Sequence, residues 1–424
     1  MRPFSTALLA AIALTACSTA PTAGDGDAVV VVVGAIYPLS GSQGQGGIDE
    51  HRGALLAAEL VNADGGVGGR PIEIVSIDVA TADAAPEAVE RLGASGIDVV
   101  IGSYGSTISA PASETAAAND MLFWETGAVG MLTARSEQGE RTFRMPPTGA
   151  VLGRNAIEFV DGPLAEALGR DPAGLRYAVS YVDDVYGRAV ADGALQAASE
   201  LDLEVVGRFG YDLATADYDA LARRIDRSRA DVLFVSAYLA DAVELRRALV
   251  RHGVDLLASI GTSSSYCMPE FGAALGDGAV GLFASDKPSG AAINPESLGP
   301  AGAVLLERGR AAYAERWGEA MSPAALAGFS AAWALFAEVM PAAERTGGTL
   351  STDALAEAAL AVDLPMGSLP NGSGLRFGAP GTATAGDNVA AAAVIWEWTP
   401  PGEHVVVWPP ELATDPVRAM DIAP

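Results

Sequence analysis

The hydrophobic residues of the chain fall into short runs that alternate with amphipathic stretches. Residues 29–36 form an unbroken apolar run rich in valine, a pattern typical of a strand buried on both faces of a sheet. Residues 49–62 follow with apolar positions at helical spacing. The same order then predicts strands at 72–77, 97–101 and 121–124 and helices at 87–92 and 109–119. Strands that alternate with helices in this way indicate βαβ units around a parallel sheet.

A second, similar series begins after the Pro-Pro pair at residues 146–147. It predicts helices at 149–168, 188–201, 218–228 and 241–252 and strands at 177–182, 204–209, 232–235 and 256–260. Beyond it we expect helices at 302–317, 322–343 and 352–361, and a hairpin around 391–398 and 404–408. The apolar run 324–340 contains Ser330 and Glu338, so we interpret it as a buried helix and not as a membrane span. The chain therefore predicts two similar α/β halves.

Composition excludes several classes of protein. The 424 residues carry 26 basic and 53 acidic side chains, a net charge of −27, so we expect no nucleic acid partner and no general basic surface for anionic lipid. Two cysteines and three histidines exclude a disulfide scaffold and make a Cys/His zinc site unexpected. We predict no metal and no cofactor. Lys287 is the only lysine.

The amino-terminal segment is typical of a signal peptide. Arg2 precedes an apolar stretch of about ten residues, which is too short to span a bilayer. The sequence LTAC at residues 14–17 resembles a bacterial lipobox, which implies that residues 1–16 are removed and that Cys17 is lipidated. Several acyl chains on one cysteine would give durable membrane anchoring. Residues 17–28 are small and polar and suit a flexible tether.

Polar, hydroxyl-rich turns follow the predicted strands. In doubly wound sheets, ligands bind beyond the carboxyl ends of strands and near helix amino termini. Those positions contain hydroxyl groups, aromatic rings and almost no ionic catalytic groups, in the segments 37–40, 102–107, 125–128, 183–187, 236–238 and 261–266. Such turns hold small polar molecules through neutral hydrogen bonds and backbone amides.

Motifs that carry catalysis are absent. The sequence has no phosphate-binding G-x-x-x-x-G-K-[ST] loop, no G-x-S-x-G elbow, no S-x-x-K and no H-E-x-x-H. Residues 44–47 do not match G-x-G-x-x-G, and we interpret them as a flexible turn. Enzymatic activity is therefore not supported. An enzyme that used this site would have only Glu125 and the pair Asp183 and Asp184 as acidic candidates.

Four segments together carry a resemblance to a known family. They are GAIYPLSG at 34–41 with the stretch 52–72, then IGSYGST at 101–107, DDVYGRA at 183–189 and IGTS at 260–263. In this order they resemble the leucine/isoleucine/valine-binding protein family, the substrate-binding components of hydrophobic amino acid and amide ABC importers. The resemblance covers residues 29–408.

The resemblance implies the periplasmic-binding-protein-like type I fold, an α/β architecture of two Rossmann-like lobes joined by a three-strand hinge. Lobe 1 would comprise residues 29–145 plus 282–364, and lobe 2 residues 146–281 plus 365–408, followed by a tail at 409–424. A ligand that bridges both lobes only in the closed form shifts the hinge equilibrium toward closure. The implied partners are a small-molecule ligand and the permease subunits of an ABC transporter, with the protein held outside the cytoplasm on the cell envelope.

The family's ligand-binding positions carry over to specific residues. Ser106 falls where the family binds the ligand carboxylate, and the same turn contributes Ser103, Tyr104 and Thr107. The next turn contributes backbone groups and a hydroxyl from residues Glu125, Thr126, Gly127 and Ala128. Lobe 2 would contribute Tyr186, Tyr238 and Ser263.

Two departures from the family pattern bear on the ligand. Ser263 stands where amino acid binders have an acidic residue for the ammonium, and an unpaired buried ammonium is costly. Either Glu125, Asp183 or Asp241 substitutes, or the ligand has no ammonium and is an amide, a urea-like molecule or a small carboxylate. A family tyrosine is also missing near Gly46, which predicts a roomier pocket.

The alternative function is a ligand-binding sensor of the same fold that acts on a signalling partner.

Overall fold

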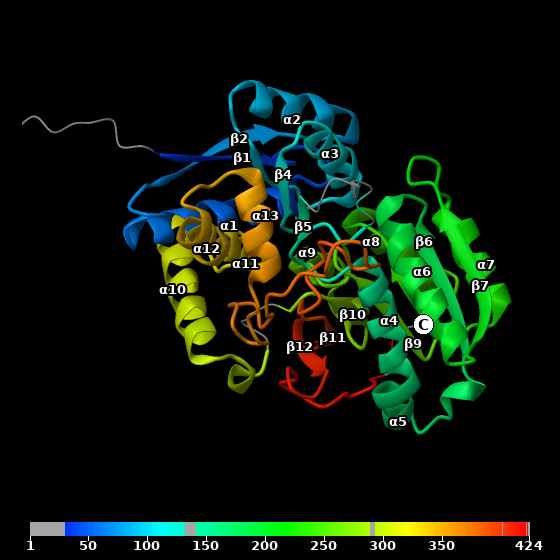
Figure 1. Ribbon diagram of the computed structural model, residues 1–424. Helices are drawn as coiled ribbons and strands as arrows, with labels where there is room; N and C mark the ends of the chain where they lie inside the picture. The colour runs from blue at the N-terminus through cyan, green and yellow to red at the C-terminus, as the bar shows by residue number, and fades with distance from the viewer. Residues whose placement is uncertain are drawn as a thin grey trace, which may run out of the picture.

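The computed structural model describes residues 30–130, 132, 141–288, 293–400, 402–420 and 422. The predicted signal peptide and tether, with Cys17, lie outside the described residues. In this part of the chain, the strands form two sheets that lie in separate lobes (Figure 1). The predicted α/β architecture of two lobes is confirmed.

The first lobe is built on a five-stranded parallel sheet in the order β2-β1-β3-β4-β5. Helices cover both of its faces. Ile36 packs in the cluster beneath α2 and α3, whereas Val33 and Ala35 pack beneath α1 and α11. Burial on both sides explains why the first strand is apolar throughout. The strands are β1 (Val31–Tyr37), β2 (Ile72–Asp78), β3 (Val99–Gly102), β4 (Leu122–Glu125) and β5 (Thr142–Arg144). The helices are α1 (Gly44–Ala63), α2 (Ala85–Ala94), α3 (Ser106–Ala118), α10 (Pro300–Trp317), α11 (Pro323–Trp333), α12 (Met340–Gly347) and α13 (Thr352–Ala361).

The second lobe contains a seven-stranded sheet in the order β12-β11-β10-β9-β8-β6-β7. The strands from β6 to β10 run parallel, β11 runs antiparallel to β10, and β12 runs antiparallel to β11. The strands are β6 (Arg176–Val182), β7 (Glu204–Tyr211), β8 (Val232–Ser236), β9 (Ala258–Thr262), β10 (Phe283–Asp286), β11 (Val394–Thr399) and β12 (Glu403–Trp408). The helices are α4 (Gly149–Phe159), α5 (Ala165–Leu168), α6 (Val185–Glu200), α7 (Tyr218–Ser228), α8 (Leu239–Arg251) and α9 (Pro269–Leu275).

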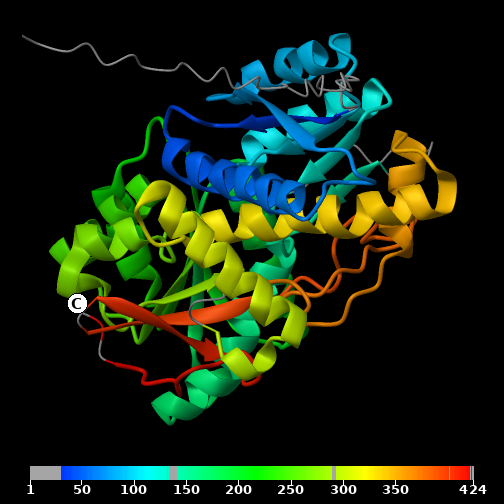
Figure 2. The ribbon, with the colours of Figure 1, turned by 90° about the vertical axis from the view of Figure 1, so that its left-hand side faces the viewer.

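The longest apolar helix belongs to the core of lobe 1. By length and composition the helical run Pro323–Gly347 could cross a membrane, but 72% of its most apolar window is buried. It packs along α1, and Figure 2 shows the two helices side by side. The approach is close because Gly53 and Gly328 lie in the contact, where a Cβ would collide with the backbone of the opposite helix. The predicted buried helix is confirmed.

Four elements differ from the sequence prediction. Helix α1 begins at Gly44 and not at residue 49, so the predicted flexible turn is its first turn. Glycine is the residue that fits at position 47, because a side chain there would collide with Pro38. Strands β5 and β10 and helix α9 were not predicted, since each is short.

Three connections join the lobes, at residues 145–148, 287–299 and 362–393, and residues 289–292 among them are outside the described part. Two details differ from the predicted lobe boundaries. Strand β10 pairs with β9 and so belongs to the sheet of lobe 2, whereas the sequence assigned it to lobe 1. In the third connection, Leu375 and Phe377 pack in the core of lobe 1, and the Phe377 ring lies 4.9 Å from that of Phe143.

Candidate functional site

The turn after β3 is stabilised largely by its own polar groups. Ser103 is fully buried, and its hydroxyl bonds to Ser109 Oγ at 2.7 Å and Gly105 O at 3.2 Å. Ser106 Oγ accepts a hydrogen bond of 2.9 Å from Gly130 N, and Thr107 Oγ1 accepts one of 3.2 Å from Gln43. Ser103 therefore supports the turn from inside, whereas the Ser106 proton has no acceptor among the described residues.

Glu125, at the end of β4, organises the next turn. It is fully buried and accepts hydrogen bonds from Gly127 N at 2.7 Å, Ala128 N at 2.6 Å, Ser103 N at 3.2 Å and the Ser109 hydroxyl. Burial raises the pKa of Glu125 to about 7, although the hydrogen bonds from Ser109, Ala128 and Gly127 oppose that shift. The Glu125 oxygens, and the backbone N–H groups of Gly127 and Ala128 that were predicted to bind the ligand, are thus already engaged in hydrogen bonds within the protein.

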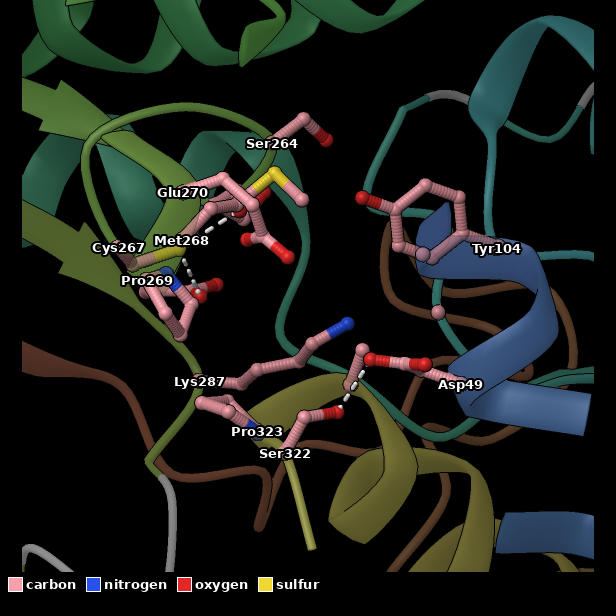
Figure 3. A pocket seen from close by; sticks show the side chains of 15 residues that line it. Asp49, Tyr104, Ser264, Cys267, Met268, Pro269, Glu270, Lys287, Ser322 and Pro323 are labelled. Carbon is pink, nitrogen blue, oxygen red and sulfur yellow. Dashed lines mark hydrogen bonds between the residues drawn. The ribbon is translucent and has the colours of Figure 1, made fainter. Parts of the chain in front are cut away.

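The cavity between the lobes lies beside these turns (Figure 3). The space that the centre of a water-sized sphere can reach is about 60 Å³, which corresponds to roughly five water positions at 10–15 Å³ each. Of the predicted site residues, Tyr104, Gly127 and Ser263 line it. Gly127 has no side chain because a Cβ there would collide with the Glu50 carboxylate.

Tyr104 fills the space beside Gly46. A side chain on Gly46 would collide with the Tyr104 ring, so the absence of a tyrosine on α1 does not leave the empty space that the sequence predicted. Tyr104 has a backbone φ of 89°, which costs energy for a residue with a Cβ. In Figure 3 its ring extends across the cavity toward Ser264 of lobe 2. Burial raises the pKa of the Tyr104 phenol, which therefore stays neutral.

The predicted residues of lobe 2 form a hydrogen-bonded group behind the cavity. Tyr186 OH bonds to Thr262 Oγ1 at 2.6 Å, and burial raises its pKa to about 12. Its ring lies 5.3 Å from that of Tyr238, whose hydroxyl donates to Asp184 Oδ2 at 2.7 Å. Both tyrosines are therefore packed against the wall that Ser263 lines.

None of the three carboxylates named as substitutes for the missing acidic residue lines this cavity. Glu125 holds its own turn. Asp183 is half-exposed and pairs with Arg188 at 2.7 Å. Asp241 is buried and accepts a hydrogen bond from the Tyr211 hydroxyl, and burial raises its pKa to about 6.

The ionic groups at the cavity are ones that the sequence analysis did not select. Asp286 ends β10, Lys287 follows it, and both line the cavity. Lys287 Nζ lies 2.9 Å from Glu50 Oε1, and both side chains are buried. Burial would lower the pKa of Lys287, but the charges of Glu50 and Asp286 outweigh it and raise that pKa, so the ammonium stays charged. The available signal was that the sole lysine of the chain lies next to an aspartate.

The comparisons with known proteins agree with this architecture. The family model for periplasmic binding proteins matches residues 30–393. Leu/Ile/Val-binding protein homolog 8 from Brucella suis is 29% identical over 412 residues, which cover 96% of this chain and 97% of that protein. Homolog 7 from Brucella abortus is 27% identical over 390 residues and covers 92% of this chain and 94% of its own.

Solved structures show the same fold. The branched-chain amino acid transporter substrate binding protein LivJ from Streptococcus pneumoniae, in complex with isoleucine, has a TM-score of 0.70 at 19% identity and covers 90% of this chain and 100% of its own. A solute binding protein of an ABC transporter from R. palustris, in complex with benzoate, has a TM-score of 0.69 at 17% identity and covers 89% and 96%. The predicted fold class is confirmed, and the chain belongs to the periplasmic binding protein family.

Proposed function

We propose that this protein captures a small polar solute between its two lobes outside the cytoplasm and delivers it to the permease subunits of an ABC transporter. The observation that carries the proposal is the cavity between the lobes, which polar groups from both lobes line. A solute that contacts Tyr104 on one side and Ser263 on the other is held by both walls only when the lobes are closed. Such a solute stabilises the closed form, which a transporter can recognise.

The predicted binding residues divide into two roles in this proposal. Tyr104, Gly127 and Ser263 contact the solute, because they line the cavity. Ser106 and Thr107 contribute hydroxyl groups at the start of α3 as the lobes close. The remaining predicted residues hold these in place, namely Ser103, Glu125, Thr126, Ala128, Tyr186 and Tyr238. No bond is made or broken in the solute.

The anchoring of the protein follows from its predicted amino terminus. Lipidated Cys17 would attach the mature protein to the cell envelope, and residues 17–28 would let the lobes move away from the membrane surface. A Cys17→Ser variant that stays in the membrane fraction after expression in a bacterial host would contradict the anchor without touching the binding function.

The function is tested by titrating the purified mature chain calorimetrically with amino acids, small amides and short carboxylates. We expect saturable binding of one solute per chain, accompanied by a smaller radius of gyration in X-ray scattering as the lobes close. Binding without any change in radius would contradict the closure mechanism. A folded protein that binds no member of the panel would contradict the proposed function.

A further inference from the structure

Lobe 2 contains a second hollow, a groove between the end of α8 and the end of α9. Its lining residues are Arg246, Arg247, Val250, Arg251, Ala274, Leu275 and Gly278. The space that the centre of a water-sized sphere can reach there is about 330 Å³, against about 60 Å³ in the cavity between the lobes. The groove and the cavity share no lining residue. The groove is therefore a separate place where a small molecule can bind.

The charge around this groove is the reverse of the charge of the whole protein. The chain has a net charge of −27, but residues 223–251 contain seven arginines and only four acidic residues. Three of these arginines line the groove, and no acidic residue lines it among the described residues. In a strongly acidic protein, a hollow lined by arginine side chains favours the entry of anions.

Arg247 and Arg251 lie one helical turn apart at the rim of the groove, and each side chain is about half exposed. Arg247 donates to Glu244 Oε1 at 2.9 Å and to Ala274 O at 3.2 Å. Arg251 donates twice to Asp219 Oδ1, at 2.8 and 3.3 Å. A guanidinium has five N–H donors in a planar fork that matches carboxylate and phosphate groups. The contacts within the described residues therefore leave donors on both side chains for an anion.

Arg246 is the buried member of the group. It is only 1% exposed and still lines the groove. Its Nε donates to Gly278 O at 3.2 Å, which holds the guanidinium against the turn after α9. Burial lowers the pKa of Arg246, and an anion close to a guanidinium favours its charged form. A positive charge is thus fixed in the wall of the groove.

The other side chains of the groove are apolar. Val250, Ala274 and Leu275 line it beside the arginines, and Val250 is 41% exposed. An inorganic ion would leave these side chains in contact with water. The carbon skeleton of an organic anion would cover them and gain hydrophobic contact. The lining therefore favours an anion that also has an apolar part.

We propose that this groove is a second ligand site, which binds a small organic anion with a carboxylate or phosphate group and a short apolar skeleton. Arg247 and Arg251 bind the anionic oxygens, and Arg246 supplies positive charge behind them. Val250 and Leu275 cover the carbon atoms of the ligand. The site lies outside the cavity between the lobes, so its existence does not depend on which solute that cavity takes.

The test uses compounds that differ in charge but share a skeleton, in calorimetric titrations of the mature chain. One set is 3-methylbutanoate, 3-methylbutanamide and 3-methylbutylamine, and the other is phenyl phosphate and phenol, with inorganic phosphate as an anion that has no skeleton. We expect saturable binding of at least one of the two organic anions. The amide, amine, phenol and inorganic phosphate should bind roughly tenfold or more weakly than that anion. Binding should also weaken in about 0.5 M KCl, because the two rim arginines are exposed to screening.

A pair of variants locates the binding. The double variant Arg247→Gln/Arg251→Gln removes the rim charges, and Arg154→Gln is a control that removes two exposed ion pairs of the same lobe, with Glu158 and Glu200, away from the groove. We expect the double variant to bind the anion roughly tenfold or more weakly and the control to bind it unchanged. The melting temperature of both ligand-free variants should change little, because exposed ion pairs contribute little stability.

The other outcomes contradict the proposal. If the double variant binds the anion as tightly as the wild type, the anion occupies a different place, such as the cavity between the lobes. If the neutral relatives bind as tightly as the anions, the arginines do not recognise charge. If both variants lose affinity equally, the effect comes from the net charge of the protein and not from the groove. If neither organic anion binds to the folded wild type, the groove is not a ligand site of this class.

Discussion

Glu125 and Asp286 are both carboxylates buried at the carboxyl ends of parallel strands, but the protein surrounds them differently. Glu125 accepts hydrogen bonds from three backbone amides and one hydroxyl. Asp286 accepts one from a thiol, and its other oxygen has no partner in the described residues. Burial raises the pKa of both carboxyl groups. The number of hydrogen-bond donors around each carboxylate, and not its burial, therefore distinguishes Glu125, which holds its turn together, from Asp286, which has one oxygen without a donor in the described residues.

The two regions also differ in how charge is compensated. In the β4 turn, neutral hydrogen-bond donors stabilise the Glu125 carboxylate. At the end of β10, the single ammonium of Lys287 pairs with Glu50 and is also stabilised by the charge of Asp286. A single substitution should therefore disturb the second region more than the first.

The largest effect is expected at Lys287. Lys287→Met leaves the fully buried Glu50 without its counter-charge, and breaking a buried pair in this way costs about 3–5 kcal/mol of unfolding free energy. Adding Glu50→Gln should recover at least half of the loss, because the remaining side chains are neutral at that position. Urea denaturation of the two proteins measures both values. If the double variant is as unstable as the single one, charge pairing is not what Lys287 provides.

The second prediction concerns pH and the β4 turn. The pKa of Glu125 is raised by burial from 4.5 to about 7, so between these values the folded state holds a proton that the unfolded state has lost. Stability from this group is therefore present below pH 4.5 and lost as the pH rises through 7, by roughly 3 kcal/mol in total. Glu125→Gln cannot titrate, yet it keeps one oxygen for the backbone amides.

The measurement is the difference in unfolding free energy between wild type and Glu125→Gln at pH 4.5, 6 and 8. We expect the wild type to lose stability relative to the variant as the pH rises. Burial also lowers the pKa of His51 and His404 to about 4. Since both proteins contain these two histidines, their contribution cancels in the difference. Parallel stability curves would show that Glu125 is already ionised in the folded protein.

The contrast between the two regions also explains what the sequence could predict. The βαβ order follows from apolar periodicity, and parallel strands bring their carboxyl ends to one edge, so residues such as Tyr104, Gly127 and Ser263 could be placed at a common site. Which hydroxyl bonds to which carboxylate depends on packing between distant segments. Glu125 was therefore predicted to face the ligand, although its oxygens are directed at its own turn.

Asp286 and Lys287 escaped prediction for a different reason. Strand β10 has only four residues, and two of them are polar, so periodicity gives no signal there. Helix α1 shows the reverse case. Its first turn contains three glycines and reads as a loop, but close contacts with Pro38 and Tyr104 exclude side chains and make glycine the residue that fits. In both places tertiary contacts determine a secondary structure that local propensity does not predict.

The smallest predicted effect compares two serines within one turn. The Ser103 proton is used inside the turn, by Ser109 Oγ or Gly105 O, whereas Ser106 accepts from Gly130 N and keeps its proton for another acceptor. Each serine-to-alanine change removes a buried hydrogen bond and should lower the unfolding free energy by about 1 kcal/mol. Only Ser106→Ala should also weaken binding of the best solute in the panel, roughly tenfold, because in the proposed function the Ser106 hydroxyl donates to the solute once the lobes close. Equal affinity losses in the two variants would mean that the turn acts on the solute as a rigid unit and that no single hydroxyl contacts it.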